Sequence, residues 1–174
     1  NDDYVDLGTI STSNKLQLSS PANNGLTIMF SSYGAAGGDD FSRIIDKSNS
    51  GNAANGWSIW RNLTPNNFTF RSNNVYSLNS SNSGIVTNTW AIWAISHNQT
   101  TGDWVWFKNG QSDSSGNQSY SIPSVQTNAR IGTWNHSTAR EFNGRIGFIL
   151  VYEKALSSDE VQQNYNYFKD RYGL

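Results

Sequence analysis

Short apolar runs recur along this chain at regular intervals, and clusters of Gly, Asn, Ser and Thr separate them. Runs of this length, rich in β-branched and aromatic residues and bounded by turn formers, are typical of β-strands. Many short strands at regular spacing predict an antiparallel sandwich or jelly roll. The expected strands cover residues 4–8, 26–31, 42–46, 57–62, 68–72, 90–97, 104–109, 130–133 and 145–152.

The composition agrees with an all-β domain, because the polar residues are mainly Asn, Ser, Thr and Gly, and 13% of the chain is aromatic. A length of 174 residues, without a visible repeat or linker, predicts a single domain over residues 1–174. The chain has no cysteine, which excludes a disulfide scaffold and a cysteine nucleophile. A net charge of −1 makes nucleic acid and anionic membranes unexpected partners.

One helix is expected near the C-terminus. Residues 157–160 read Ser-Ser-Asp-Glu, a capping box in which the hydroxyl of Ser157 accepts the amide of Glu160 and the Glu160 carboxylate accepts the cap amide. Gly173 provides a C-terminal cap. The apolar residues that follow at helical spacing are Val161, Tyr165, Phe168 and Tyr172. The chain is therefore expected to end as a strand, a short turn and an amphipathic helix.

Three C-terminal segments, "ARIGTW", "FNGRIGFILVYEKALSSDEV" and "NYFKDRYGL", carry a recognisable pattern. They resemble the end of the laminin-G-like, concanavalin A-like lectin-glucanase jelly-roll family. Upstream, "SRIIDKSNSGNAANGWSIW" and "TWAIWAISHNQTTGDWVWFKNG" are similar to its middle strands. The resemblance implies a two-sheet antiparallel jelly-roll sandwich with one short C-terminal α-helix. Many relatives carry an acidic residue after the isoleucine of the late strand, where this chain has Gly147.

Catalysis is not expected, although this fold hosts glycoside hydrolases and polysaccharide lyases. The hydrolases place carboxylates on one strand as E-x-D-x-x-E, and the lyases carry their own strand motifs, none of which occurs here. His97 and His136 are the only histidines, and neither has an acid or tyrosine partner at strand spacing. The sequence therefore predicts a protein that is not an enzyme.

A calcium ion is one candidate cofactor. The loop Gly37-Gly38-Asp39-Asp40 offers two adjacent carboxylates on a flexible backbone, and calcium prefers oxygen ligands. Members of the resembled family often hold a structural calcium in a loop near the sheet edge. The alternative is a solvated acidic turn. We therefore expect Asp39 and Asp40 to be the ligands if one structural calcium is bound.

Aromatic residues suggest a ligand-binding face. Period-2 alternation places Trp104, Trp106 and Lys108 on one face of a strand, and a face that carries a lysine is not expected to be the sealed core. Sugar rings pack on tryptophan while their hydroxyls bond polar groups. These three residues are therefore the first candidates for ligand binding. The secondary candidates are Trp60, Arg61 and Arg71, and the candidates in loops at the rim are Tyr33, Trp134 and His136.

Two functions lead at this stage, and a polysaccharide-degrading enzyme with an unfamiliar site is the less favoured third. The first is a non-catalytic carbohydrate-binding or adhesion module with a polysaccharide or glycan ligand, either extracellular in a secreted microbial protein or on a virion surface. The second is a structural or assembly domain, such as a phage capsid decoration or tail module within a larger parent protein. An aromatic cluster on a concave sheet favours the sugar, whereas a flat apolar patch favours a protein partner.

Overall fold

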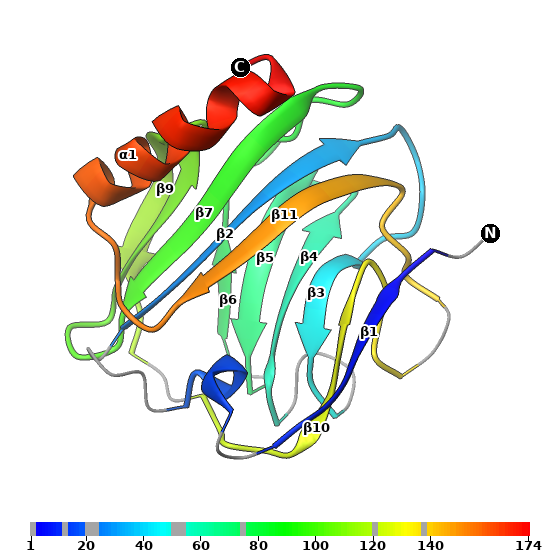
Figure 1. Cartoon of the computed structure of the whole chain (residues 1–174), viewed down its shortest axis with the longest axis vertical. Helices are drawn as coiled ribbons and strands as arrows, with labels where there is room; N and C mark the ends of the chain where they lie inside the picture. Colours follow the sequence, from blue (N-terminus) through cyan, green and yellow to red (C-terminus); the bar gives the residue numbers. More distant parts are fainter. Residues whose placement is uncertain are drawn as a thin grey trace.

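The computed structural model describes residues 3–11, 14–19, 25–49, 55–73, 76–119, 122–136 and 139–174. Its strands form two antiparallel sheets packed face to face (Figure 1). Sheet A has the order β1-β10-β3-β4-β5-β6, and sheet B has the order β11-β2-β7-β8-β9. The strands are β1 (Val5–Ile10), β2 (Gly25–Gly34), β3 (Ser42–Lys47), β4 (Trp57–Asn62), β5 (Asn67–Ser72), β6 (Tyr76–Asn79), β7 (Trp90–Asn98), β8 (Asp103–Lys108), β9 (Gln111–Asn117), β10 (Thr127–Ile131) and β11 (Gly144–Tyr152). The predicted two-sheet jelly roll with one C-terminal α-helix is confirmed.

Every expected strand has a counterpart, and β6 and β9 are two strands that the sequence pattern did not reveal. β9 reads QSDSSGN and contains no large apolar residue, so it has no hydrophobic alternation to detect. It forms because the Asn109-Gly110 turn, with positive φ at both residues, folds it back onto β8. β6 is only four residues long and pairs with β5 at the edge of sheet A.

The main hydrophobic core lies between the two sheets. Sheet A contributes residues such as Ile59 and Phe68, and sheet B contributes Phe30 and Trp93. Phe68 meets Phe30 edge to face at 5.1 Å between ring centroids, and meets Trp93 at 5.2 Å. Aromatic pairs in this geometry add to the stabilisation from burial alone. The core therefore ties the centres of both sheets together.

A second hydrophobic cluster lies on the outer face of sheet B, under helix α1 (Ser158–Phe168). Ser157 caps the helix with the predicted capping box, and Gly173 ends the following 3-10 turn, Lys169–Tyr172, with a φ of 68°. Phe168 packs on Phe148 of β11 at 4.6 Å between ring centroids. Figure 1 shows α1 lying along sheet B, on the side away from sheet A.

The predicted strand over 145–152 is present as β11, but it is a half-buried edge strand rather than a fully buried one. Its apolar run is nearly continuous because both of its faces are covered. Ile149 and Val151 pack against the main core, whereas Leu150 and Tyr152 pack in the cluster under the helix. A strand that is covered on both faces lacks the alternation of apolar and polar residues that marks a strand with one solvent-exposed face.

The register of β11 against β2 shifts between Ile146 and Phe148, which places Gly147 at an irregularity. A Cβ atom built on Gly147 would lie 2.4 Å from the Tyr172 hydroxyl and 2.5 Å from the Ser31 Oγ. The end of the tail therefore occupies the space that a side chain at position 147 would need.

The outer face of sheet A is different, because neither α1 nor the 3-10 turn after it lies there (Figure 1). Its strands direct polar side chains outward, and the loops before β3 and after β10 border it. Among the described residues, no helix is long and apolar enough to cross a membrane.

Candidate functional site

The outer face of sheet A brings together side chains from neighbouring strands β4, β5 and β6. Alternation sends Phe68 and Phe70 of β5 into the core, so Thr69 and Arg71 point outward. Trp60 of β4 pairs with Thr69 in the ladder. The same register brings the outward-facing side chains of three strands into one patch.

These side chains line a hollow of about 280 Å³. Its described lining contains two aromatic rings, one guanidinium group, four amides, two threonines, one serine and one proline, and it contains no carboxylate. The lining residues are Phe41, Trp60, Asn62, Thr64, Pro65, Asn67, Thr69, Arg71, Ser77, Asn79 and Asn82. The hollow therefore combines many neutral hydrogen-bonding groups with a single cation.

The amides of the hollow form a hydrogen-bonded network. Asn62 Nδ2 donates to Asn67 Oδ1 and to Thr69 Oγ1, both at 2.7 Å. Thr69 Oγ1 donates to Asn79 Oδ1 at 2.7 Å, and Asn67 Nδ2 donates to Asn82 Oδ1 at 3.2 Å. Both amide hydrogens of Asn67 are used inside the protein, as are those of Asn62, because Asn67 Nδ2 also donates to the Ser80 carbonyl at 3.2 Å. The connected network fixes the orientation of each amide, and the exposed amides Asn79 and Asn82 are the ones that face solvent.

Guanidinium groups and aromatic rings alternate beside the hollow, in a series that we call the arginine ladder: Arg71, Trp60, Arg43, Trp134 and Arg140. The Arg43 guanidinium carbon lies 4.6 Å from the Trp60 ring centroid and 6.0 Å from that of Trp134. Arg140 lies 4.5 Å from the Trp134 ring, and Arg71 lies 5.9 Å from the Trp60 ring. Contacts of this kind between cations and rings are favourable, and more so when water is excluded.

Arg43 is the anchor of this ladder, with an exposed fraction of 1%. Its Nε donates to the buried Asp46 carboxylate at 3.0 Å, and its Nη1 donates to the Phe41 carbonyl oxygen. Burial lowers the pKa of Arg43, and the charge of Asp46 opposes that effect. Because a buried charge needs its partner, the Asp46 carboxylate keeps the Arg43 guanidinium in place between the two tryptophan rings.

The first sequence candidates do not lie on an open face. Trp106 has an exposed fraction of 0% and sits in the core between the sheets, where its Nε1 donates to the Leu78 carbonyl at 3.0 Å. Trp104 is half-buried and packs against the same core. The expectation that the face bearing Lys108 lies outside the sealed core is therefore wrong. The helix covers the other face of β8, and Lys108, at the strand end, reaches the Gly84 carbonyl at 2.7 Å.

The secondary candidates divide between two faces. Trp60 and Arg71 line the hollow, although Trp60 is only 3% exposed because Phe41 and Arg43 pack around it. Arg61 points to the inner side instead, where it donates to the Ala35 carbonyl at 2.9 Å. A buried arginine in that position serves the fold and offers no donor to a ligand on the outer face.

The rim candidates also separate. Trp134 joins the arginine ladder, and His136 lies beside it with its Nε2 3.2 Å from the Ser48 carbonyl. Tyr33 lies elsewhere, because its ring contacts Trp90 at 5.7 Å on the side of sheet B where the tail docks. The structure therefore brings Trp134 close to the outer face of sheet A and places Tyr33 away from it.

Several residues of this face were not among the sequence candidates. The amides Asn62, Asn67, Asn79 and Asn82 look like ordinary turn or edge residues in a chain so rich in asparagine. A usable signal was nevertheless present on β5, where Asn67, Thr69 and Arg71 alternate with two phenylalanines. One strictly polar face indicates an open face better than an isolated lysine does.

The predicted calcium ligands have separate partners. Asp40 Oδ1 accepts the Leu63 amide at 2.8 Å, and Asp39 Oδ2 accepts the Arg140 amide at 2.9 Å. Asp39 also lines a polar hollow of about 420 Å³ with Glu141 and Asn143. Among the described residues, no three acidic, cysteine or histidine side chains gather closely enough to hold a metal. A calcium here would depend on Asp39 and Asp40 together with carbonyl and amide oxygens, and calcium binding stays a prediction.

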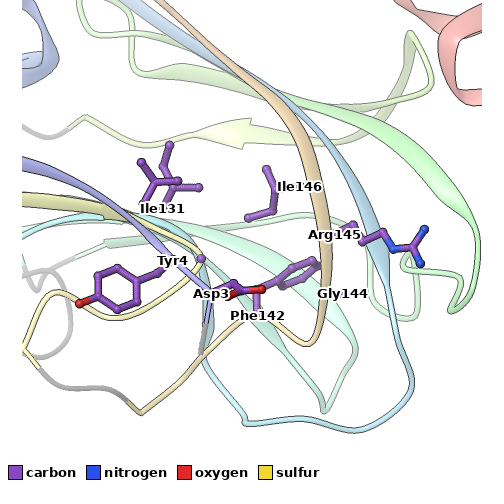
Figure 2. A pocket seen from close by; sticks show the side chains of 9 residues that line it. Asp3, Tyr4, Ile131, Phe142, Gly144, Arg145 and Ile146 are labelled. Carbon is purple, nitrogen blue, oxygen red and sulfur yellow. The ribbon is translucent and has the colours of Figure 1, made fainter. Parts of the chain in front are cut away.

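Another hollow, of about 300 Å³, lies at the edge of the sandwich where β1 and β10 approach β11 (Figure 2). Its floor includes Ile131, Phe142 and Ile146, which pack against the main core. Figure 2 shows the Arg145 side chain directed away from Ile146, and its guanidinium carbon lies 5.6 Å from the Tyr33 ring. This hollow offers mainly apolar surface, in contrast to the amide-rich hollow on sheet A.

Neither histidine lines the amide-rich hollow. His97 is buried, with its Nε2 3.0 Å from the Gln118 carbonyl, and burial lowers its pKa. With no carboxylate or histidine among its described lining residues, the hollow has no general acid or base for glycoside hydrolysis.

The two-sheet jelly-roll sandwich that carries this face has known counterparts. The sequence profile of the concanavalin A-like lectin/glucanases superfamily matches residues 1–162, and the chain belongs to this family. No curated protein sequence matches the chain significantly.

Solved structures share the fold at low sequence identity. The CBM40 of the Ruminococcus gnavus IT-sialidase, bound to α2,3-sialyllactose, is 15% identical with a TM-score of 0.66, over 94% of this chain and 98% of that one. The Streptococcus pneumoniae NanB sialidase is 16% identical with a TM-score of 0.68, over 94% of this chain and 26% of that one. A Bacteroides ovatus protein, described provisionally as carbohydrate-binding, is 14% identical with a TM-score of 0.64. This match covers 80% of this chain and 40% of the Bacteroides ovatus chain. The chain thus spans less than half of two of these three proteins.

Proposed function

We propose that this domain is a non-catalytic carbohydrate-binding module whose ligand site is the amide-rich hollow on the outer face of sheet A. The observation that carries the proposal is the lining of that hollow. Neutral amides and hydroxyls in a fixed network suit the many hydroxyl groups of a sugar, and the exposed ring of Phe41 suits its C–H face. A secreted or virion-exposed setting, where such a module would meet polysaccharide, is part of the proposal.

Two further observations support this choice of site. The hollow in Figure 2 is mainly apolar, so it would leave most sugar hydroxyls without partners. The outer face of sheet B is covered by α1 and its apolar cluster. Among the solved structures of the same fold, the Ruminococcus gnavus CBM40 is bound to a sugar ligand, sialyllactose.

The test blocks the hollow without removing any of its hydrogen bonds. Ser77 is exposed on β6 and lines the hollow, so Ser77→Trp places an indole inside it. The matched control is Gln163→Trp, which adds the same group to an exposed position of α1. The measurements are thermal melting, retention on insoluble algal, plant and bacterial polysaccharides, and binding to a glycan array.

We expect the wild type and Gln163→Trp to bind the same glycans, and Ser77→Trp to lose at least about tenfold in affinity (about 1.4 kcal/mol), with all three melting at similar temperatures. Wild-type affinity in Ser77→Trp would place the sugar elsewhere on the domain. A wild type that binds no glycan in either assay would contradict the proposal and favour the assembly role.

A further inference from the structure

We propose that the hollow selects glycans that carry an anionic group, a carboxylate or a sulfate ester, and that Arg71 recognises this group. This inference rests on the proposed function, because it names the ligand class of the same site. It concerns selectivity, since the amides and hydroxyls would serve a neutral sugar equally well.

The charges around the hollow are unbalanced. Arg71 is the cation in its described lining, and that lining contains no carboxylate. The adjoining arginine ladder adds Arg43 and Arg140. Asp46 is fully buried and paired with Arg43, and Asp40, at the border, accepts the amide of Leu63. Asp39 accepts the Arg140 amide, so the acids beside the ladder balance its arginines, whereas the described lining of the hollow itself carries the net positive charge of Arg71.

The position of Arg71 keeps its guanidinium group within reach of a ligand. On the outer face Arg71 lies between Ser58 of β4 and Ser77 of β6, the residues directly opposite it on the two neighbouring strands. Both flanking positions carry small side chains, and the guanidinium carbon lies 5.9 Å from the centroid of the Trp60 ring. A planar guanidinium that is confined in this way can donate two parallel hydrogen bonds to a carboxylate.

Partial burial strengthens the selectivity. Burial lowers the pKa of Arg71, because the charged form loses hydration in this position. An anion bound beside the guanidinium would offset that loss, whereas a neutral hydroxyl would offset much less of it. The low overall charge of the protein provides no general attraction for polyanions, so discrimination would depend on this residue.

The experiment uses pairs of glycans that share a backbone and differ in charge: polygalacturonate with its methyl ester, chondroitin sulfate with desulfated chondroitin, and α2,3-sialyllactose with lactose. Affinities are measured by titration at low and at high salt. The variants are Arg71→Gln, Arg71→Lys and the control Arg145→Gln, which removes the same charge from an exposed residue outside this hollow. Thermal melting verifies that each variant is folded.

We expect the wild type and Arg145→Gln to prefer the charged member of at least one pair by about tenfold or more, with the preference decreasing as salt increases. Arg71→Gln should bind both members at the neutral-sugar level. Arg71→Lys should retain part of a preference for sulfate and lose more of one for carboxylate, because it keeps the charge without the planar group.

Equal affinity within every pair, or glycan binding confined to neutral sugars, would overturn this inference and leave the proposed function standing. An equal loss of preference in Arg145→Gln and Arg71→Gln would also overturn it, because the effect would then come from overall charge. The proposed function fails if the wild type binds no glycan, and its assignment to this hollow fails if Ser77→Trp keeps wild-type affinity.

Discussion

The two sheets have opposite outer faces. The outer face of sheet B carries an apolar cluster that includes Met29 and Phe107, and the chain's own C-terminal helix covers it. The outer face of sheet A carries an amide network and arginines, and α1 leaves it uncovered (Figure 1). The comparison teaches that the tail determines which face of the sandwich is available, since apolar outward side chains require a cover and polar ones do not.

The largest test of this difference removes the cover's main contact. Phe168→Ala should lower the free energy of unfolding by about 3 kcal/mol, because it leaves a cavity over Phe148. The adjacent Tyr167, with an exposed fraction of 82%, is the matched control, and Tyr167→Ala should stay within about 0.5 kcal/mol of the wild type. Urea unfolding measures both, and small, equal changes would mean that the helix does not stabilise sheet B.

The inner side of sheet A also carries a charged residue, Lys47, and it makes the stability of the fold depend on pH. Lys47 is fully buried, its Nζ donates to Gln17 Oε1 and to the Val125 carbonyl, and burial lowers its pKa to about 8. The unfolded chain keeps this proton up to a pH of about 10.4, so between about pH 8 and that value it binds more protons than the folded state. Wild-type stability should therefore rise through that window by about 1–3 kcal/mol relative to Lys47→Met. Parallel pH curves for the two proteins would contradict this prediction.

Calcium binding would stabilise the loop that borders the outer face of sheet A, because Asp40 accepts the Leu63 amide beside the hollow. If Asp39 and Asp40 ligate the ion, calcium at ten times its Kd should stabilise the fold by about 1.4 kcal/mol, or about 3–5 °C in melting temperature. EDTA should reverse the shift. Identical melting curves with calcium and with EDTA would remove the metal from this loop.

The smallest effect concerns the start of the covering helix. Ser157→Ala removes the hydroxyl that accepts the Glu160 amide at 3.2 Å and should cost about 1 kcal/mol. Ser158→Ala, one residue inside the helix, is the control and should change stability by less than about 0.5 kcal/mol. Equal losses in the two variants would show that the capping bond is not the cause.

Sequence reasoning predicted the sandwich and the helix because strand spacing and capping are local signals. Alternation with the core residues Ile59 and Phe70 placed Trp60 and Arg71 on the outer face, where they line the hollow, and their contact with a ligand stays a prediction. The same reasoning failed at Trp106, because both faces of β8 are covered. The alternation of residue types cannot show which face packs against sheet A and which packs under the helix. The choice depends on where a segment some 50 residues further along the chain docks, which no local pattern contains.

Gly147 gives the docked tail a consequence for sequence change. A Cβ atom at this position would lie 2.4 Å from the Tyr172 hydroxyl and 2.5 Å from the Ser31 Oγ, so any side chain there requires these groups to shift. Gly147→Asp would therefore report on the tail as well as on the strand, because the added side chain fits only if the end of the chain moves on sheet B.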